Sequence, residues 1–204
     1  MVKRVKGEWA ASVPYTNTAF RPYVTALGQL TLAWNDLHET LAILFCSVMG
    51  GGFSNQFLAV WHALKSDRSQ RDILLAAVKS GLIEGGPPRL LVDVTWICNQ
   101  ADALEDARNT ALHSPLWGSK WQSGTIIQPQ IGLGHVRASR LSGKNLLAEF
   151  RWCRDASTVL RNFAMEIDMV LSRGGTWPDQ PALPNRGHGQ QTKGTTRKKP
   201  SRTT

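Results

Sequence analysis

The amino-acid sequence predicts an all-α protein, an antiparallel bundle of four to five helices with a small loop or hairpin insertion after the third helix. Apolar residues recur every three and four positions over several long segments, which is the period of an amphipathic helix. Clusters of glycine and proline separate these segments and mark where helices end and begin. Residues 176–204 are rich in proline, glycine, threonine and basic side chains, so they are predicted to be a disordered basic tail.

The length of 204 residues fits one domain with two tails. Residues 1–20 show no helical period and contain Pro14, so they are predicted to form an irregular N-terminal arm. Residues 21–175 are predicted to form the helical domain, with the insertion at about 114–143. The basic tail then follows this domain.

The first helix is predicted from about Tyr23 to Met49, with Pro22 in its first turn and three glycines after it. His38 lies on the flank of its apolar seam, where a histidine with a hydrogen-bond partner at the core edge is expected more often than a ligand-binding one. The residues of the seam repeat at three and four: Leu27, Leu30, Trp34, Leu37, Leu41, Leu44 and Val48.

Residues 54–80 are predicted to form either one helix kinked near Ser66 or two helices in tandem. Ser66 and Asp67 are residue types that begin helices, and Gln70 completes a pattern close to a capping box. Arg68 and Arg71 lie three apart at the start of the second half. They are candidates for contacts with an RNA phosphate, and a solvated pair is the alternative.

The third helix is predicted from Pro88 to His113, because Pro115 pushes the residue before it out of the helical region. At 100° per residue, Arg108 falls near the middle of the apolar stripe of this helix. A guanidinium in that position needs a partner, since desolvation costs several kcal/mol. Two plain interpretations are that Arg108 reaches solvent at the end of the bundle or that it pairs with Glu105. The stripe consists of Leu90, Val94, Ile97, Ala101, Leu104 and Leu112.

The insertion after this helix differs in composition from the helical segments. Its β-branched run, Thr125-Ile126-Ile127, predicts a small hairpin. Trp117 and Trp121 are candidates for stacking on RNA bases, although two tryptophans in a long loop more often anchor it to the core. A last helix is predicted over about 144–172.

The net charge of +9 lies mainly in the tails, because residues 9–173 carry 15 basic and 13 acidic side chains, a balance of +2. Such tails attract phosphate backbones without reading sequence, or they only increase solubility. Cys46, Cys98 and Cys153 are scattered and odd in number, which is typical of core residues in a reducing compartment. No apolar run reaches the roughly 18–20 residues of a membrane span, and no secretory signal is visible. These features predict a cytoplasmic protein without membrane contact.

The cluster of Arg108, Asn109 and His113 at the end of the third helix is the candidate catalytic site. Histidine and cysteine pairs at metal-binding spacings are absent from the sequence, so no metal or cofactor is expected. Arginine and histidine suit phosphate chemistry, because a guanidinium matches phosphate oxygens and an imidazole transfers protons near neutral pH. RNA supplies its own nucleophile, the 2′-hydroxyl. Because Arg108 and His113 are about 140° apart on the helix, two copies related by a two-fold axis would assemble the site.

The sequence Arg108-Asn109-x-x-x-His113 resembles the Arg-x(4–6)-His signature of HEPN domains (higher eukaryotes and prokaryotes nucleotide-binding), in the form with Asn after Arg. The resemblance in helical layout covers about residues 20–173. It implies a homodimer whose composite site cleaves RNA without a metal and leaves a 2′,3′-cyclic phosphate. Members of this family often serve in bacterial toxin–antitoxin or anti-phage systems, which implies an antitoxin or nucleotidyltransferase partner.

Two alternatives to a nuclease stay open at this point. One is a non-catalytic module of the same type that binds RNA, a nucleotide or a protein partner. The other is a structural helical dimer in which Arg108 forms an ion pair across the interface.

Overall fold

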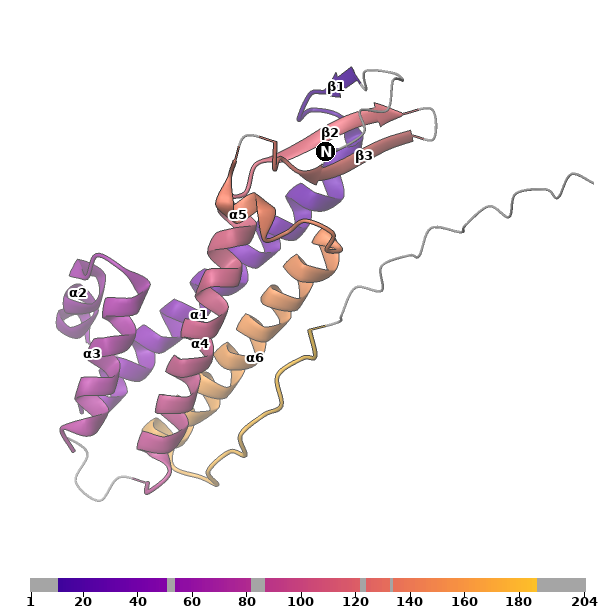
Figure 1. The fold of residues 1–204 in the computed structure, drawn as a ribbon. Coiled ribbons are helices and arrows are strands. Elements are labelled where there is room, and N and C mark those ends of the chain that lie inside the picture. The colour runs from indigo at the N-terminus through magenta and orange to yellow at the C-terminus, as the bar shows by residue number, and fades with distance from the viewer. Residues whose placement is uncertain (1–10, 51–53, 82–86, 122–123, 133, 187–204) are drawn as a thin grey trace, which may run out of the picture.

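The computed structural model describes residues 11–50, 54–81, 87–121, 124–132 and 134–186. Most of this part of the chain is helical, as predicted, and a small three-stranded sheet lies at one end of the helices (Figure 1). None of the described helices has an apolar stretch that would let it cross a membrane.

Three long helices form the body of the protein: α1 (Arg21–Val48), α4 (Leu90–His113) and α6 (Leu146–Arg173). Their apolar faces meet in one core, in which the α1 seam from Leu30 to Val48 is almost completely buried and Leu27 is partly buried. Pro22 occupies the first turn of α1 as predicted. Cys46, Cys98 and Cys153 are buried and free, as expected of core cysteines.

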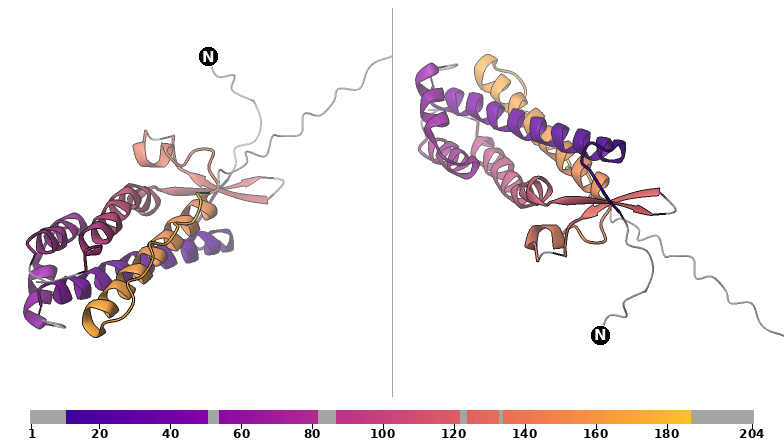
Figure 2. Two further views of the ribbon diagram at one scale, coloured as in Figure 1. Left: turned by 90° about the horizontal axis from the view of Figure 1, so that it is seen from below. Right: turned by 90° about the horizontal axis from the view of Figure 1, so that it is seen from above.

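Helices α1 and α6 are parallel, which differs from the antiparallel bundle predicted. Arg154 near the start of α6 bonds Gln29 near the start of α1, and Asp168 near the end of α6 accepts from Ser47 near the end of α1. Helix α4 runs in the opposite direction and packs against both (Figure 2). The reason is topological: α4 ends where α1 begins, and the insertion stays at that end of the bundle, so α6 starts beside the start of α1.

Residues 54–80 form two helices, α2 (Asn55–Ala63) and α3 (Asp67–Lys79), so the tandem alternative is correct. Leu64 leaves the helical region with ψ 137°, which ends α2. Ser66 then caps α3, because its hydroxyl accepts a hydrogen bond from the backbone N–H of Ser69 at 3.1 Å. The cap residue at this position was therefore visible in the sequence.

The insertion contains the predicted hairpin, formed by β2 (Leu116–Trp121) and β3 (Gly124–Pro129), and a short helix, α5 (Val136–Ser139). A third strand, β1 (Ala11–Val13), pairs antiparallel with β2, so the sheet order is β1-β2-β3. The prediction of an irregular arm over residues 1–20 is therefore wrong for β1 and for the 3-10 helix at Thr18–Phe20. Residues 1–10 lie outside the described residues.

Gly118 explains how the arm joins the sheet. A Cβ atom at this position would lie 2.9 Å from Phe20 and 3.0 Å from both Val13 and Ile127. The missing side chain lets the arm and the hairpin approach each other closely.

The segment that follows α6 runs back along the bundle as far as Arg186 (Figure 1). The indole N–H of Trp177 donates to the buried carboxylate of Asp93 at 2.7 Å, and the indole N–H of Trp152 donates to the backbone oxygen of Pro184 at 3.0 Å. The prediction of disorder is wrong for residues 176–186, because aromatic and polar contacts with α4 and α6 hold them. The remaining tail, 187–204, lies outside the described residues.

Candidate functional site

Helix α4 ends at His113 as predicted, because Ser114 adopts an extended conformation with ψ 118° before Pro115. The apolar stripe of this helix is buried from Leu90 to Leu104. Toward the end of the helix, Leu112 is half-buried. Arg108, Asn109 and His113 lie in the last two turns of α4, next to the sheet.

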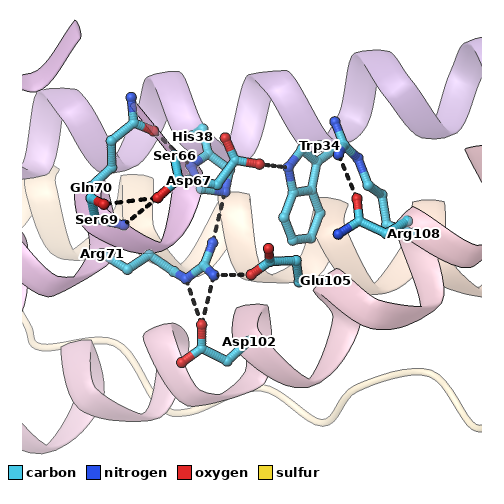
Figure 3. Close-up of polar contacts among 11 residues, drawn as sticks. Trp34, His38, Ser66, Asp67, Ser69, Gln70, Arg71, Asp102, Glu105 and Arg108 are labelled. Atoms are coloured by element: carbon cyan, nitrogen blue, oxygen red, sulfur yellow. Dashed lines mark hydrogen bonds and ion pairs between the residues drawn. The ribbon is translucent and has the colours of Figure 1, made fainter. Parts of the chain in front are cut away.

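Arg108 is half-buried, and its guanidinium lies over the indole of Trp34 with 5.5 Å between the guanidinium carbon and the ring centroid (Figure 3). Its Nη1 donates to the side-chain oxygen of Asn109 at 2.8 Å. Its Nε is buried and has no hydrogen-bond partner within the described part of the chain. The predicted pairing with Glu105 does not occur, since Glu105 binds Arg71 instead.

Asn109 is half-buried and His113 is exposed. Because they lie four residues apart, both side chains are on the same side of α4, whereas Arg108 turns toward α1. The side-chain oxygen of Asn109 accepts a hydrogen bond from Nη1 of Arg108, so these two neighbouring side chains are in contact. Within one chain, Arg108 and His113 thus remain separated around the helix axis, as the sequence predicted.

Arg71 is the arginine that is truly buried, and the sequence interpretation missed it. Its side chain is 1% exposed. Its Nη2 lies 2.6 Å from an oxygen of Asp102 and also binds Glu105, and its Nη1 lies 3.2 Å from Nε2 of His38 (Figure 3). Neither a solvated pair with Arg68 nor an RNA phosphate contact fits this position, so both expectations for Arg71 are corrected. Arg68 itself is exposed.

His38 is the hydrogen-bonded core histidine that the sequence favoured. Because a guanidinium only donates, Nε2 accepts from Arg71 and Nδ1 carries the proton toward Gln70, 3.2 Å away. Burial lowers the pKa of His38 below its usual 6.5, and the charges of Arg71 and Arg108 lower it further, while Asp67 and Gln70 raise it. The ring is therefore neutral near pH 7.

Trp34 connects these groups. Its indole lies near both guanidiniums, 5.5 Å from that of Arg108 and 6.0 Å from that of Arg71, and its ring centroid is 5.1 Å from that of His38. Its N–H donates to the carboxylate of Asp67 at 2.7 Å. The face of the Trp34 indole therefore holds the guanidinium of Arg108 in place. The sequence placed Trp34 in the apolar seam and gave no sign of its polar contacts.

Trp117 and Trp121 project from the sheet and stay 36% and 46% exposed. The indole N–H of Trp117 donates to Ser12 at 3.0 Å, and that of Trp121 donates to Ser119 at 2.9 Å. Neither ring is a buried anchor of the insertion. Because Trp117 and Trp121 are four positions apart on β2, both rings lie on the same face of the sheet. Contact of these rings with RNA bases stays a prediction.

A pocket of about 360 Å³ lies on the side of α4 away from Arg108, between α4, α5, the start of α6 and the end of the described tail. Thr110 lines it and points about 160° away from Arg108 around the helix. Sequence reasoning did not identify this pocket, because its residues come from four separate segments. Its polar side chains are Asp106, Thr110, Arg140, Lys144, Glu149 and Arg186.

The remaining groups to consider in the described residues are possible metal ligands and the cysteine thiols. No group of three or more His, Cys, Asp or Glu side chains in that part of the chain is placed to hold a metal ion. Burial raises the pKa of the Cys98 and Cys153 thiols to about 12, so neither is a thiolate at neutral pH.

The protein is mostly helical, and Arg108, Asn109 and His113 lie near the end of α4, where Arg108 bonds Asn109. Comparison of the chain with family models, with curated proteins and with solved structures finds no match. The assignment of a function therefore rests on the residues and their geometry.

Proposed function

We propose that the protein is a HEPN-like endoribonuclease that cleaves RNA without a metal ion, at a site shared by two copies of the chain. Arg108, Asn109 and His113 are the catalytic residues of each copy. The observation that carries the proposal is the position of Arg108, whose half-buried guanidinium is held between Trp34 and Asn109 near the end of α4. A guanidinium fixed in this way is preorganised for a phosphate oxygen.

The reaction joins the 2′-oxygen to phosphorus and breaks the bond from phosphorus to the 5′-oxygen. The neutral imidazole of one His113 takes the proton of the 2′-hydroxyl, and the protonated imidazole of the other His113 gives a proton to the leaving 5′-oxygen. The products are a 2′,3′-cyclic phosphate and a 5′-hydroxyl. No metal is needed, since the protons and the nucleophile come from the imidazoles and the RNA.

The two remaining residues act on the phosphate. Arg108 compensates the negative charge that grows on the equatorial oxygens through the fixed charge of its guanidinium. The amide oxygen of Asn109 accepts from Arg108, so its NH₂ group is left to donate to the phosphate or to orient the imidazole.

Two copies are needed because Arg108 and His113 of one chain face different sides of α4. A two-fold axis near the end of α4 would bring both sets of residues to one cleft. An antitoxin or nucleotidyltransferase partner would regulate such an enzyme. Sedimentation of the full chain checks the first part of the proposal, and a monomer at the concentrations of the activity assay argues against it.

The test is cleavage of a mixed-sequence RNA in EDTA by the full chain. We expect His113→Ala and Arg108→Ala to lower the rate by about 10²–10⁴-fold. The matched control is His62→Ala, because His62 is an exposed histidine of α2 outside the site. Equal rates in all four proteins, or no cleavage by the wild type, would overturn the proposal.

A second candidate is a non-catalytic module that binds RNA. The exposed rings of Trp117 and Trp121 and the exposed Arg68 favour it, because stacking and charge are enough to bind a single strand. This candidate predicts RNA binding without product and a loss of affinity in Trp117→Ala that His113→Ala does not share.

A further inference from the structure

Thr110 in the pocket beside α4 has an unused hydroxyl. The side chain is 5% exposed, and its Oγ1 has no hydrogen-bond partner among the residues that the structure describes. Other hydroxyls on the long helices bond back to the preceding turn, as Thr40 does to the oxygen of Asp36 at 2.8 Å and Ser157 does to that of Cys153 at 2.9 Å. Leaving a buried hydroxyl without a partner costs about 1–3 kcal/mol, so the missing partner of Thr110 calls for an explanation, and a ligand in the pocket would supply one.

Three basic side chains line the same pocket as Thr110. Arg140 binds both oxygens of Asp106 at 2.8 Å, and Arg186 binds Glu149. Lys144 lies 3.8 Å from Glu149, which is a loose contact. With three cations and two carboxylates, the pocket keeps one positive charge, and Lys144 is the cation with the weakest protein partner.

The position of the pocket at a helix end also favours an anion. It lies at the N-terminal end of α6, a helix of 28 residues, where the partial positive charge of the helix favours an anion. Glu149 and Phe150 of the first turns of α6 and Lys144 just before it all line the pocket. Thr110, the loosely paired Lys144 and the start of α6 thus line the same pocket.

The remaining wall is apolar and formed mainly by small side chains. The small residues follow one another at four-residue spacing on α4, and two buried larger residues complete the wall: Ala103, Ala107, Ala111, Leu141 and Phe150. A volume of about 360 Å³ is within the range of small-molecule sites. The pocket therefore suits a ligand with a flat apolar body and an anionic end.

We propose that this pocket binds a small phosphomonoester with a flat apolar group, its phosphate held by Lys144, Arg140 and the hydroxyl of Thr110. A phosphate is favoured over a carboxylate because three donors need more than two acceptor oxygens. The proposal is independent of ribonuclease activity, since Arg108, Asn109 and His113 do not line this pocket.

The test is calorimetric titration of the full chain with four probes: phenyl phosphate, inorganic phosphate, phenol and benzoate. Phenyl phosphate should bind most tightly, because it alone combines the phosphate with the flat body. No binding of phenyl phosphate, phenol binding as tightly as phenyl phosphate, or benzoate matching it would each overturn the proposal.

Variants locate the binding. Thr110→Val keeps the shape and removes the hydroxyl, so phenyl phosphate should bind about fivefold more weakly, and Thr110→Ser should restore part of the loss. Lys144→Gln should weaken binding about three- to tenfold and reduce its salt dependence. Unchanged affinity in both Thr110→Val and Lys144→Gln would refute the assignment.

Two controls separate this site from the proposed nuclease site and from general destabilisation. His113→Ala should bind phenyl phosphate as the wild type does, even if RNA cleavage is lost. Thr40→Val removes a buried helical hydroxyl that already has a partner, so it should leave the affinity unchanged. Equal weakening in Thr40→Val and Thr110→Val would show that stability alone moves the affinity and would overturn the proposal.

Discussion

The side chain of Arg71 is 1% exposed, whereas the side chain of Asp102, whose carboxylate oxygen lies 2.6 Å from the Arg71 guanidinium, is 47% exposed. The pair joins α3 to α4 across the edge of the core. The two partners therefore differ in what each would lose if the other were removed. A carboxylate left alone regains water, and a guanidinium left alone stays buried without compensation.

This asymmetry predicts unequal costs. Arg71→Met should lower the free energy of unfolding by about 1–3 kcal/mol, because the half-exposed Asp102 and Glu105 keep their contact with water. The double variant Asp102→Asn/Glu105→Gln should cost more, about 3–5 kcal/mol, because the charge of Arg71 then has no counter-charge. Urea unfolding measures both. Arg68→Met, at an exposed position, should change stability by less than about 0.5 kcal/mol, and the reverse order of the two costs would contradict this account.

His38 should make stability depend on pH in the acidic range. Since burial lowers its folded-state pKa below the unfolded value of about 6.5, the unfolded chain binds more protons between these two values. Stability contributed by the neutral ring is thus complete above about pH 6.5 and is lost as the pH falls toward the folded-state pKa. His38→Gln should flatten urea unfolding profiles between pH 7 and 5, and His62→Gln, at an exposed position, should not. A wild-type profile that rises on acidification in this range would have the wrong sign.

Trp34→Phe tests the indole that fixes Arg108. The ring stays, but the N–H that donates to Asp67 is lost, so we expect a cost of about 1–2 kcal/mol in chemical unfolding. A phenylalanine ring also attracts a guanidinium less strongly than an indole does, so both Arg71 and Arg108 should be held less firmly. If Arg108 acts on RNA, this variant should lower the cleavage rate at a pH and temperature where it is fully folded. The control Trp152→Phe removes an indole bond to Pro184 far along the chain and should leave that rate unchanged.

Gly118→Ala tests the close approach of the arm to the sheet. Its Cβ would lie 2.9 Å from the ring of Phe20, so the variant should lose about 1–3 kcal/mol of stability and expose the arm to proteolysis near β1. Gly28→Ala is the matched control in α1, since no atom lies within 4 Å of its Cβ position. It should raise the free energy of unfolding by about 0.5–1 kcal/mol, because alanine has the higher helix propensity. Equal effects of the two substitutions would contradict the packing described.

The sequence predicted those elements whose causes are local. The end of α4 followed from Pro115, the start of α3 from Ser66, and the α1 seam from its period. Burial of Arg71 was not predictable in this way, because its carboxylate partners lie 31 and 34 residues further along the chain. The same holds for strand β1, which pairs with residues more than a hundred positions away.

The candidate site shows the same division. The positions of Arg108, Asn109 and His113 on the helix followed from the period alone. The turn of Arg108 onto Trp34, in place of Glu105, depends on the neighbouring helix α1 and on the competition of Arg71 for Glu105. The pocket that Thr110 lines is formed by four separate segments of the chain, and a sequence pattern does not predict which segments come together.

The parallel pairing of α1 and α6 has a consequence for how the chain folds during synthesis. Contacts between them span about 125 residues, as between Gln29 and Arg154, so closing this interface carries a large entropic cost and comes late. Until α6 leaves the ribosome, the leucine-rich side of α1 has no permanent cover. A nascent chain that stops before α6 should therefore depend on chaperones, and one that ends after Arg173 should be released from them.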